Sequence, residues 1–518
     1  MRAVSTNRTT NSFYNALAAI LYNVVTIAVT FILQSIFIKT LGAEYNGIKS
    51  LFQNILVMLS VVELGFGTAI VYNLYEPIYR GDTKKIRSIV KYYKKVYMVV
   101  GLLITFMGIA LFPIVPILVG QANIGYNVLF IFSLYLVNSV LSYFLSYRSS
   151  MLHADQNNRV INLVGLGTNI VKSGLQILVL LLTKNFVLFL IVQIAMTIIY
   201  NMVLYVIVGN KYPYLKDISS ATDLDIETRK NVRKKIHGLF FHKIGEFFVT
   251  GTDNILISLS KNLGVIYVGY YNNYYMVISN VALIFNGLIS AATASIGNLI
   301  VDKVRKADKL LRTYRSLVLI NSWMYCFGAI SIYCLMDPFI TLWIGPEYLL
   351  PHFVLAVLVA NFYFNGAKLA SYTFKTAAGV FYEDRFVPVV ESIVNIVFSL
   401  IFMHFFGLAG VFIGTICSSM VLLLYSYPKY VYKKIIKDKT INYYRLHVKY
   451  TLISSVVFAA VVSLCNFINI DGALAELLVK GVICLTVPNI LYLLLVVNGR
   501  DFAYLKNVLV KARVKIKK

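Results

Sequence analysis

The chain has 518 residues, of which 59% are hydrophobic and only 14% are charged, whereas soluble domains carry roughly 25% charged residues. A globular interior cannot hold so much apolar surface without exposing it, so the composition excludes an ordinary soluble enzyme and predicts a membrane protein. The net charge of +26 is typical of nucleic-acid binding, of anionic-lipid contact or of membrane orientation by basic loops.

Fourteen apolar stretches are each long enough to cross a hydrocarbon core about 30 Å thick. In chain order, the predicted spans are 13–40, 47–75, 96–118, 126–147, 160–183, 186–208, 237–260, 265–300, 316–340, 352–374, 386–405, 408–428, 450–468 and 473–498. The first span follows Arg2 and Arg8 as a signal peptide would, but its apolar run is longer than a cleavable signal. We therefore expect an all-α, polytopic membrane protein.

Basic residues gather in alternate gaps between the spans. One set of gaps, which includes both terminal tails, holds 40 Lys and Arg, whereas the opposite set holds only Lys184 and Lys261. By the inside-positive rule, both termini are cytoplasmic. The surplus charge then serves topology and contact with membrane lipids, so nucleic acid is not an expected partner. The outer loops are short, which leaves no extracytoplasmic domain for an active site.

The sequence holds no recognisable catalytic or metal-binding motif. Phosphate-binding G-x-x-x-x-G-K-[ST], H-E-x-x-H and G-x-S-x-G patterns are all absent. We expect no enzyme activity, and no cofactor apart from a coupling proton or sodium ion. The five cysteines lie in apolar stretches without C-x-x-C spacing, which predicts buried free thiols and no metal site. They are Cys326, Cys334, Cys417, Cys465 and Cys484.

Two motifs recur at nearly the same distance along the chain. The pattern L-G-x-x-Y-x-G occurs at 41–47 and, 222 residues later, at 263–269. An Arg followed ten residues later by Asn-Ile-Val occurs at Arg159 and, 226 residues later, at Arg385. These offsets indicate an internal duplication, and the even number of spans between copies predicts parallel repeats with a substrate path between them. The expected parts are an N-terminal lobe (1–208), a cytoplasmic linker (209–236), a C-terminal lobe (237–428) and an appendage of two spans with a basic tail (429–518).

Cationic residues within spans are candidates for substrate binding, because a charge at the bilayer centre costs about 2.5–3.5 kcal/mol and usually faces a cavity or a partner. Lys172 in the fifth span has no acid within a helical turn, and Lys368 in the tenth span, beside Asn365, has none either. Each lysine either lines a path for an anion or pairs with another helix. Lys49 is a further candidate, unless it snorkels to the interface. Spacings of three and four place on one face of the fifth span Asn162, Gly165, Asn169, Lys172 and Gln176.

Acidic residues within spans are candidates for binding a coupling ion. Span seven holds Glu246, which Lys243 can neutralise from three residues away, and Asp253, which has no such neighbour. Glu63 and Glu391 are the other candidates. Each carboxylate can instead form a structural pair with a lysine of another helix.

Three segments combine glycine with apolar residues, and a fourth is an Asp-Asn pair followed by apolar residues. They are Leu41-Gly42-x-Glu44-Tyr45-x-Gly47-Ile48, Val62-Glu63-Leu64-Gly65-Phe66-Gly67-Thr68-Ala69, Asp253-Asn254-Ile255-Leu256-Ile257 and Phe406-Gly407-x-x-Gly410-Val411-x-Ile413-Gly414-Thr415. Together they resemble bacterial polysaccharide-biosynthesis flippases, a family of the multidrug/oligosaccharidyl-lipid/polysaccharide exporter superfamily. The resemblance covers spans one to twelve and consists of diffuse fold signatures.

The resemblance implies two six-helix lobes around a central cavity in the bacterial cytoplasmic membrane. It implies alternating access that turns a lipid-pyrophosphate-linked oligosaccharide, for capsule, exopolysaccharide or O-antigen-type polymer, from the inner to the outer leaflet. Lys172 and Lys368 would then meet the pyrophosphate, and a polysaccharide polymerase and glycosyltransferases would be partners. The alternatives are a peptidoglycan-precursor flippase, a cation-coupled drug exporter of the same superfamily and, against the evidence of the short outer loops, an integral-membrane polymerase or ligase.

Overall fold

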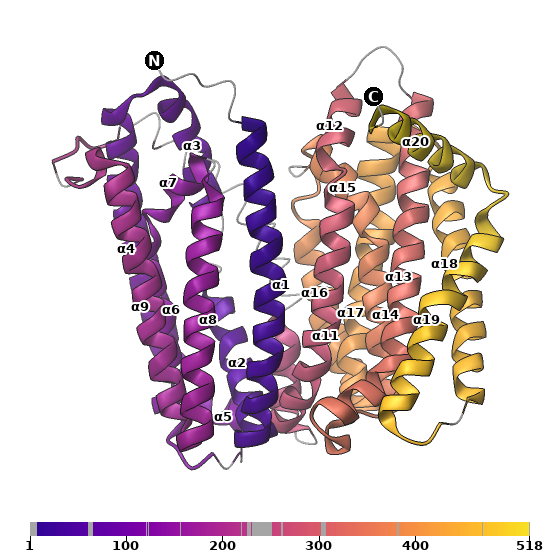
Figure 1. The fold of residues 1–518 in the computed structure, drawn as a ribbon, viewed down its shortest axis with the longest axis horizontal. Coiled ribbons are helices and arrows are strands. Elements are labelled where there is room, and N and C mark those ends of the chain that lie inside the picture. Colours follow the sequence, from indigo (N-terminus) through magenta and orange to yellow (C-terminus); the bar gives the residue numbers. More distant parts are fainter. Residues whose placement is uncertain are drawn as a thin grey trace. The chain divides into compact units, whose positions relative to one another are not determined.

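The computed structural model describes residues 8–60, 66–120, 122, 124–155, 157–218, 220–224, 229, 251–260, 263–301, 307–380, 383–468 and 470–516. All regular elements in these ranges are helices (Figure 1), and eleven of them are long and apolar enough to cross a membrane. The predicted all-α, polytopic class is therefore confirmed. The other three predicted spans differ: 47–75 is divided between two helices, 126–147 has a shorter apolar helix, and 237–260 lies largely outside the described residues.

The chain forms two compact units, Met1–Gly269 and Tyr270–Lys518, while the lobe boundaries expected from the sequence stay a prediction. The helices of the first unit are α1 (Arg8–Leu41), α2 (Ala43–Leu59), α3 (Phe66–Arg80), α4 (Thr83–Ala110), α5 (Val115–Val119), α6 (Val128–Ser146), α7 (Ser149–Ala154), α8 (Asn158–Thr183), α9 (Phe186–Lys211) and the short η2 (Pro213–Leu215). A helical stretch at 251–259 and the start of α11 (Gly264–Ser290) complete this unit.

Short polar residues set where the membrane helices begin. Asn127 caps α6 by accepting the backbone N–H groups of Leu129 and Phe130. Asn185 caps α9 by accepting the N–H of Leu188 at 3.0 Å, directly after Lys184 ends α8 with a left-handed φ of 50°. Each such cap stabilises its helix by about 1 kcal/mol. The tight turn at 184–185 returns α9 along α8, and α1 packs on the other side of α8 (Figure 1).

The two copies of the L-G-x-x-Y-x-G motif pack against each other within the first unit. Gly42 before α2 and Gly264 at the start of α11 both have a positive φ, of 90° and 72°. A Cβ on Gly47 would lie 2.0 Å from the carbonyl oxygen of Val265, and a Cβ on Gly269 would lie 2.2 Å from that of Ala43. Val265 and Ala43 are equivalent positions in the two copies, so the contact is reciprocal, as in pairs related by local two-fold symmetry. Only glycine permits this backbone approach.

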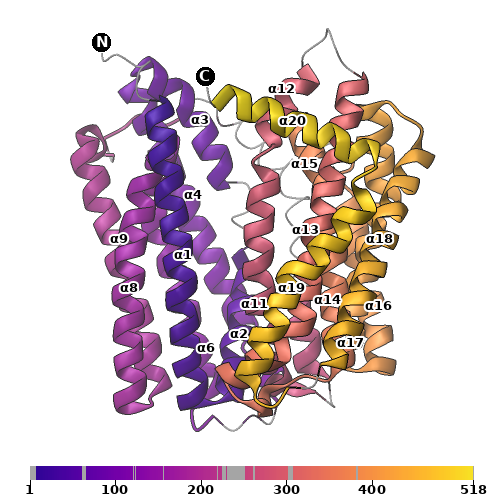
Figure 2. The same cartoon turned by 45° about the vertical axis from the view of Figure 1, so that its right-hand side comes forward.

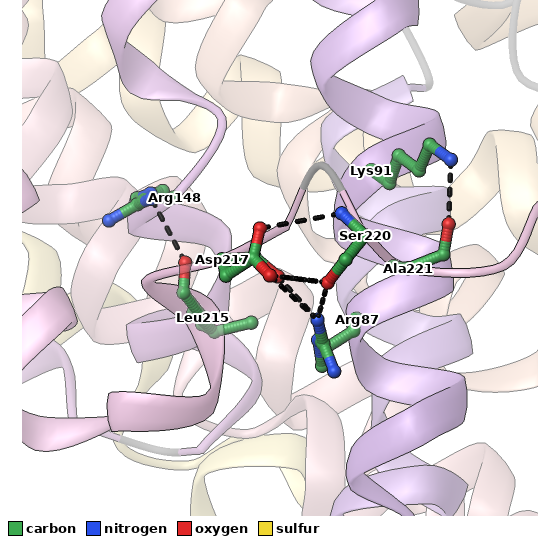
Figure 3. A network of polar contacts seen from close by, with 7 residues as sticks. All are labelled: Arg87, Lys91, Arg148, Leu215, Asp217, Ser220 and Ala221. Carbon is green, nitrogen blue, oxygen red and sulfur yellow. Dashed lines mark hydrogen bonds and ion pairs between the residues drawn. The ribbon is translucent and has the colours of Figure 1, made fainter.

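The segment after α9 is held against α4 by hydrogen bonds, as Figure 3 shows. Arg87 of α4 donates to the carbonyl oxygen of Asp217 and to the hydroxyl of Ser220, both at 2.5 Å. Lys91, one turn further along, donates to the carbonyl oxygen of Ala221 at 2.6 Å.

Further contacts hold the same segment from other sides. Arg148 donates to the carbonyl oxygen of Leu215 at 3.0 Å. A hydrogen bond and the charge of Lys91 lower the pKa of Asp223. The same segment has buried apolar side chains at intervals of three residues: Leu215, Ile218, Ala221 and Leu224. Part of the predicted linker 209–236 is thus an integral part of the first unit.

The second unit contains the helices that follow Gly269 (Figure 2). They are the remainder of α11, α12 (Thr293–Val301), α13 (Ala307–Trp343), η3 (Pro346–Tyr348), α14 (His352–Ala367), α15 (Leu369–Ala378), α16 (Val387–Phe406), α17 (Leu408–Val421), the π-helical η4 (Leu422–Ile436), α18 (Thr440–Phe467), α19 (Ala473–Val496) and α20 (Arg500–Ile516). The predicted span 265–300 is broken between α11 and α12, and the span 352–374 is broken at Lys368.

The helix α20 crosses one end of this unit and is anchored by one buried carboxylate (Figure 2). Asp501 accepts from Arg315 of α13 at 2.7 Å and from the hydroxyl of Tyr450 of α18 at 2.7 Å. Ser316 also donates to the backbone carbonyl of Asp501 at 3.1 Å. The predicted basic tail therefore begins as a helix attached to α13 and α18.

Candidate functional site

A cavity of about 470 Å³ lies in the first unit among α1, α6, α8 and α9. This volume falls within the range of about 300–1,000 Å³ that is common for small-molecule sites. Its walls are mainly polar and aromatic: Tyr22, Ser142, Tyr143, Ile161, Asn162, Gly165, Thr168, Asn169, Lys172, Met196, Thr197, Tyr200 and Asn201.

The helix α8 supplies much of this lining. Asn162, Gly165, Asn169 and Lys172, four of the five residues that the sequence places on one face, line the cavity together. At Gly165 a Cβ would lie 3.2 Å from the ring of Tyr22, so the glycine gives that ring of α1 room to form the opposite wall. The fifth residue, Gln176, is buried elsewhere and donates to the carbonyl oxygen of Phe189 at 3.3 Å.

Lys172 gives the cavity its charge. None of the described residues that line the cavity is acidic, and within the described part of the chain Lys172 forms no ion pair. The neighbouring Asn169 uses its amide to donate to Thr26 of α1 at 3.3 Å. A half-buried ammonium group without a counter-ion attracts an anion, because burial has already removed much of its hydration. The cavity is therefore suited to an anionic polar group.

The sequence did not single out the wall formed by α9. Met196, Thr197, Tyr200 and Asn201 recur at intervals of one, three and one residues, which places them on one helical face. This pattern was available as a signal but is hidden in a strongly apolar span. Thr197 also donates to Asn138 of α6 at 2.8 Å, which holds the wall in place.

Lys368 is occupied by partners in the second unit. Its amino group lies 3.5 Å from a carboxylate oxygen of Glu391 and donates to the hydroxyl of Ser419 at 3.0 Å. The side chains of Lys368 and Glu391 are 14% and 7% exposed, so this is a buried pair. It joins a candidate substrate residue to a candidate ion-coupling residue. Asn365, one turn before Lys368, instead donates to Asn361 at 2.8 Å.

The Lys368→Gln variant should be destabilised by about 1.5–3 kcal/mol, because it removes a charged partner of the buried Glu391 carboxylate. The double variant Lys368→Gln/Glu391→Gln should recover most of that loss. Thermal unfolding in detergent around this double-mutant cycle measures the coupling. The exposed pair Lys434 and Glu383, at 2.6 Å, is a matched control that should couple by less than about 1 kcal/mol. Additive effects at Lys368 and Glu391 would contradict the pairing.

Lys49 is also held by local contacts and does not line the cavity. It donates to Gln34 of α1 at 2.6 Å, and its ammonium group lies 4.3 Å from the centre of the Phe37 ring. Gln34 in turn donates to Asn46 at 2.8 Å, and Asn46 donates to the carbonyl oxygen of Gly269 at 3.0 Å. The chain of hydrogen bonds therefore ends on the second copy of the glycine motif.

Of the three remaining acidic candidates for ion coupling, the structure describes only Asp253. Asp253 is buried, beside the buried residues Thr252 and Asn254. Glu63 and Glu246 lie outside the described residues. The pair of Glu391 and Lys368 thus joins one described residue of the acidic set to one of the substrate set.

The comparisons with known proteins concern the fold. No family model matches the chain, and no curated protein matches it significantly. Among solved structures, the chain is similar to the lipid II flippase MurJ in an inward closed conformation, with a TM-score of 0.65, 14% identity, and 93% of this chain and 98% of that chain covered.

Two MATE transporters are similar as well. An inward-facing multidrug resistance MATE transporter of the MOP superfamily gives a TM-score of 0.59 at 13% identity, over 85% of this chain and 98% of that chain. The Vibrio cholerae MATE transporter VcmN gives a TM-score of 0.52 at 14% identity, over 85% and 98% of the two chains. The chain thus has the fold of MOP-superfamily transporters.

Proposed function

We propose that the protein is a flippase that moves a lipid-pyrophosphate-linked oligosaccharide repeat unit from the inner to the outer leaflet of the bacterial cytoplasmic membrane by alternating access. The main observation in support is the Lys172 cavity, which offers one ammonium group and several amide and hydroxyl groups, and no acidic residue among its described lining residues. A pyrophosphate supplies the missing negative charge, and sugar hydroxyls suit the amides and tyrosines around it. The transporter-like fold supports the same function class.

In this proposal, the buried pair of Lys368 and Glu391 couples substrate binding to the binding of a proton or sodium ion. While Glu391 is ionised it holds the ammonium group of Lys368. Protonation of Glu391, or its engagement by a sodium ion, would release Lys368 to meet an anionic substrate. Substrate binding and ion binding would then depend on each other, as coupled transport requires.

A second candidate is a peptidoglycan-precursor flippase, which the likeness in fold to the lipid II flippase favours. Both substrates carry a pyrophosphate, so the Lys172 cavity suits either of them. A cation-coupled drug exporter is less well supported, because a lone lysine repels cationic drugs.

Reconstitution into proteoliposomes tests the proposed function. The probe is a polyprenyl-pyrophosphate oligosaccharide with a fluorophore on its sugar, and a membrane-impermeant quencher reports the leaflet that it occupies. We expect the protein to raise the rate of leaflet exchange above that of empty liposomes. Parallel liposomes contain a fluorescent peptidoglycan precursor or a cationic dye. Movement of the precursor alone would select the second candidate, and movement of the dye alone would reject both.

A further inference from the structure

Three of the five cysteines meet inside the second unit, although they are far apart in the sequence. Cys334 belongs to α13, Cys465 to α18 and Cys484 to α19. Their sulfur atoms all lie within 4.8 Å of one another. All three side chains are buried, with exposed fractions of 7%, 1% and 0%. The cluster is independent of the Lys172 cavity, which belongs to the first unit.

The two other cysteines have different surroundings. Cys326 lies eight residues before Cys334 on α13, and its thiol donates to the carbonyl oxygen of Ser454 at 3.6 Å. Cys417 is half-buried in α17. Burial alone therefore does not bring thiols together in this protein, and only the packing of α13 against α18 and α19 does so.

The spacing of the three sulfurs matches a trigonal metal site. Three sulfurs that each lie about 2.3 Å from a central ion, in one plane with it, are about 4.0 Å from one another. Since the observed separations do not exceed 4.8 Å, side-chain movements of under about one ångström would close the triangle around an ion. Thiolate sulfur is a soft ligand that selects Cu⁺ over hard cations. Structural zinc sites need a fourth ligand.

Two of the helices that carry the cysteines also carry charged groups within about one helical turn of them. Lys480 lies on α19, four residues before Cys484. It also pairs with Glu476 at 2.5 Å. Towards the end of α13, Asp337 pairs with His352 at 3.1 Å, and the His352 side chain is 82% exposed. The lysine can offset the charge of thiolates, and the carboxylates and histidine offer a cation intermediate ligands between water and the cluster.

We propose that Cys334, Cys465 and Cys484 form a trigonal thiolate site for a soft monovalent cation of the Cu⁺ class. Each thiol that becomes a ligand releases its proton to water, so binding is accompanied by proton release. No change of oxidation state is involved. The ion would tie α13, α18 and α19 together and so stabilise the appendage of spans 13 and 14 against α13.

The test is anaerobic titration of the full-length protein in detergent with Cu⁺, in competition with a coloured Cu⁺ chelator. We expect one ion per chain in the wild type. Replacement of any one ligand, as in Cys334→Ser, Cys465→Ser or Cys484→Ser, should weaken binding by more than about 100-fold. The matched controls Cys326→Ser and Cys417→Ser should bind as the wild type does. Equal binding by all five variants would overturn the proposal.

X-ray absorption at the copper edge keeps the proposal testable if a serine variant fails to fold, because it uses the wild-type protein. We expect three sulfur neighbours and no dominant nitrogen or oxygen shell. A shell of nitrogen or oxygen neighbours would place the ion elsewhere and overturn the site. Failure of the wild type to take up Cu⁺ at all would show that the three thiols only pack together. Neither result would affect the flippase assay, which does not depend on this cluster.

Discussion

The Gly47→Ala variant should fail to form the native first unit, or should form it with a loss of about 3 kcal/mol or more. Its new Cβ would lie 2.0 Å from the backbone carbonyl oxygen of Val265. A backbone atom on a packed helix cannot move aside as a flexible side chain can, so the loss should lie at the upper end of overpacking effects. Gly269→Ala should behave alike, because its Cβ would lie 2.2 Å from the carbonyl oxygen of Ala43. Size-exclusion chromatography and thermal unfolding in detergent measure both effects.

Gly287→Ala is the matched control for this prediction. Gly287 lies on α11, as Gly269 does, and apart from the adjacent backbone of that helix no atom of a described residue lies within 4 Å of the position of its Cβ. The substitution should be neutral or stabilise the protein by up to about 1 kcal/mol, because alanine favours helix. If Gly47→Ala unfolds at the same temperature as Gly287→Ala, the two motif copies do not meet as described.

The Lys172→Glu variant should abolish flipping of the pyrophosphate-linked probe, because it places a negative charge in the cavity that is proposed to take an anion. Lys172→Gln should slow flipping by about 10- to 100-fold, since hydrogen bonds to charged groups contribute about 1.5–3 kcal/mol. Lys172→Arg should largely preserve it, because the positive charge remains. The rates come from the proteoliposome assay, with each variant reconstituted at an equal amount of folded protein.

Lys184→Gln is a control at another lysine directly after the same helix. Lys184 is exposed and does not line the cavity. Its substitution should leave flipping unchanged. Wild-type flipping by a normally folded Lys172→Gln variant would show that this lysine has no part in the substrate path.

The periodicity of α8 predicted more of the cavity than any other signal in the sequence. Spacings of three and four correctly grouped Asn162, Gly165, Asn169 and Lys172. They could not exclude Gln176, because helical spacing does not tell where along a stripe a neighbouring helix begins to cover it. The wall on α9 was missed because its few polar residues are diluted in one of the most apolar spans.

Sequence patterns did not predict which side chains of different helices come into contact. Lys368 and Glu391 are 23 residues apart on different helices, so no local rule joins them. The helix break at Lys368 was missed as well, because a hydropathy window averages across it. The cysteines were expected to be buried, and four of them are, but their spacing gave no sign that three would meet. By contrast, the buried residues Leu215, Ile218, Ala221 and Leu224 offered a periodic signal that the linker would dock.

The reciprocal glycine contact has a consequence for synthesis of the chain. Its two halves are 222 residues apart, and translation at about 5–20 residues per second separates their appearance by roughly 10–45 s. During that interval the glycine face of α2 lacks its contact with α11, while the intervening spans enter the bilayer. The helices between the two motifs must therefore insert and pair without this contact, which can form only when synthesis of the first unit is nearly complete.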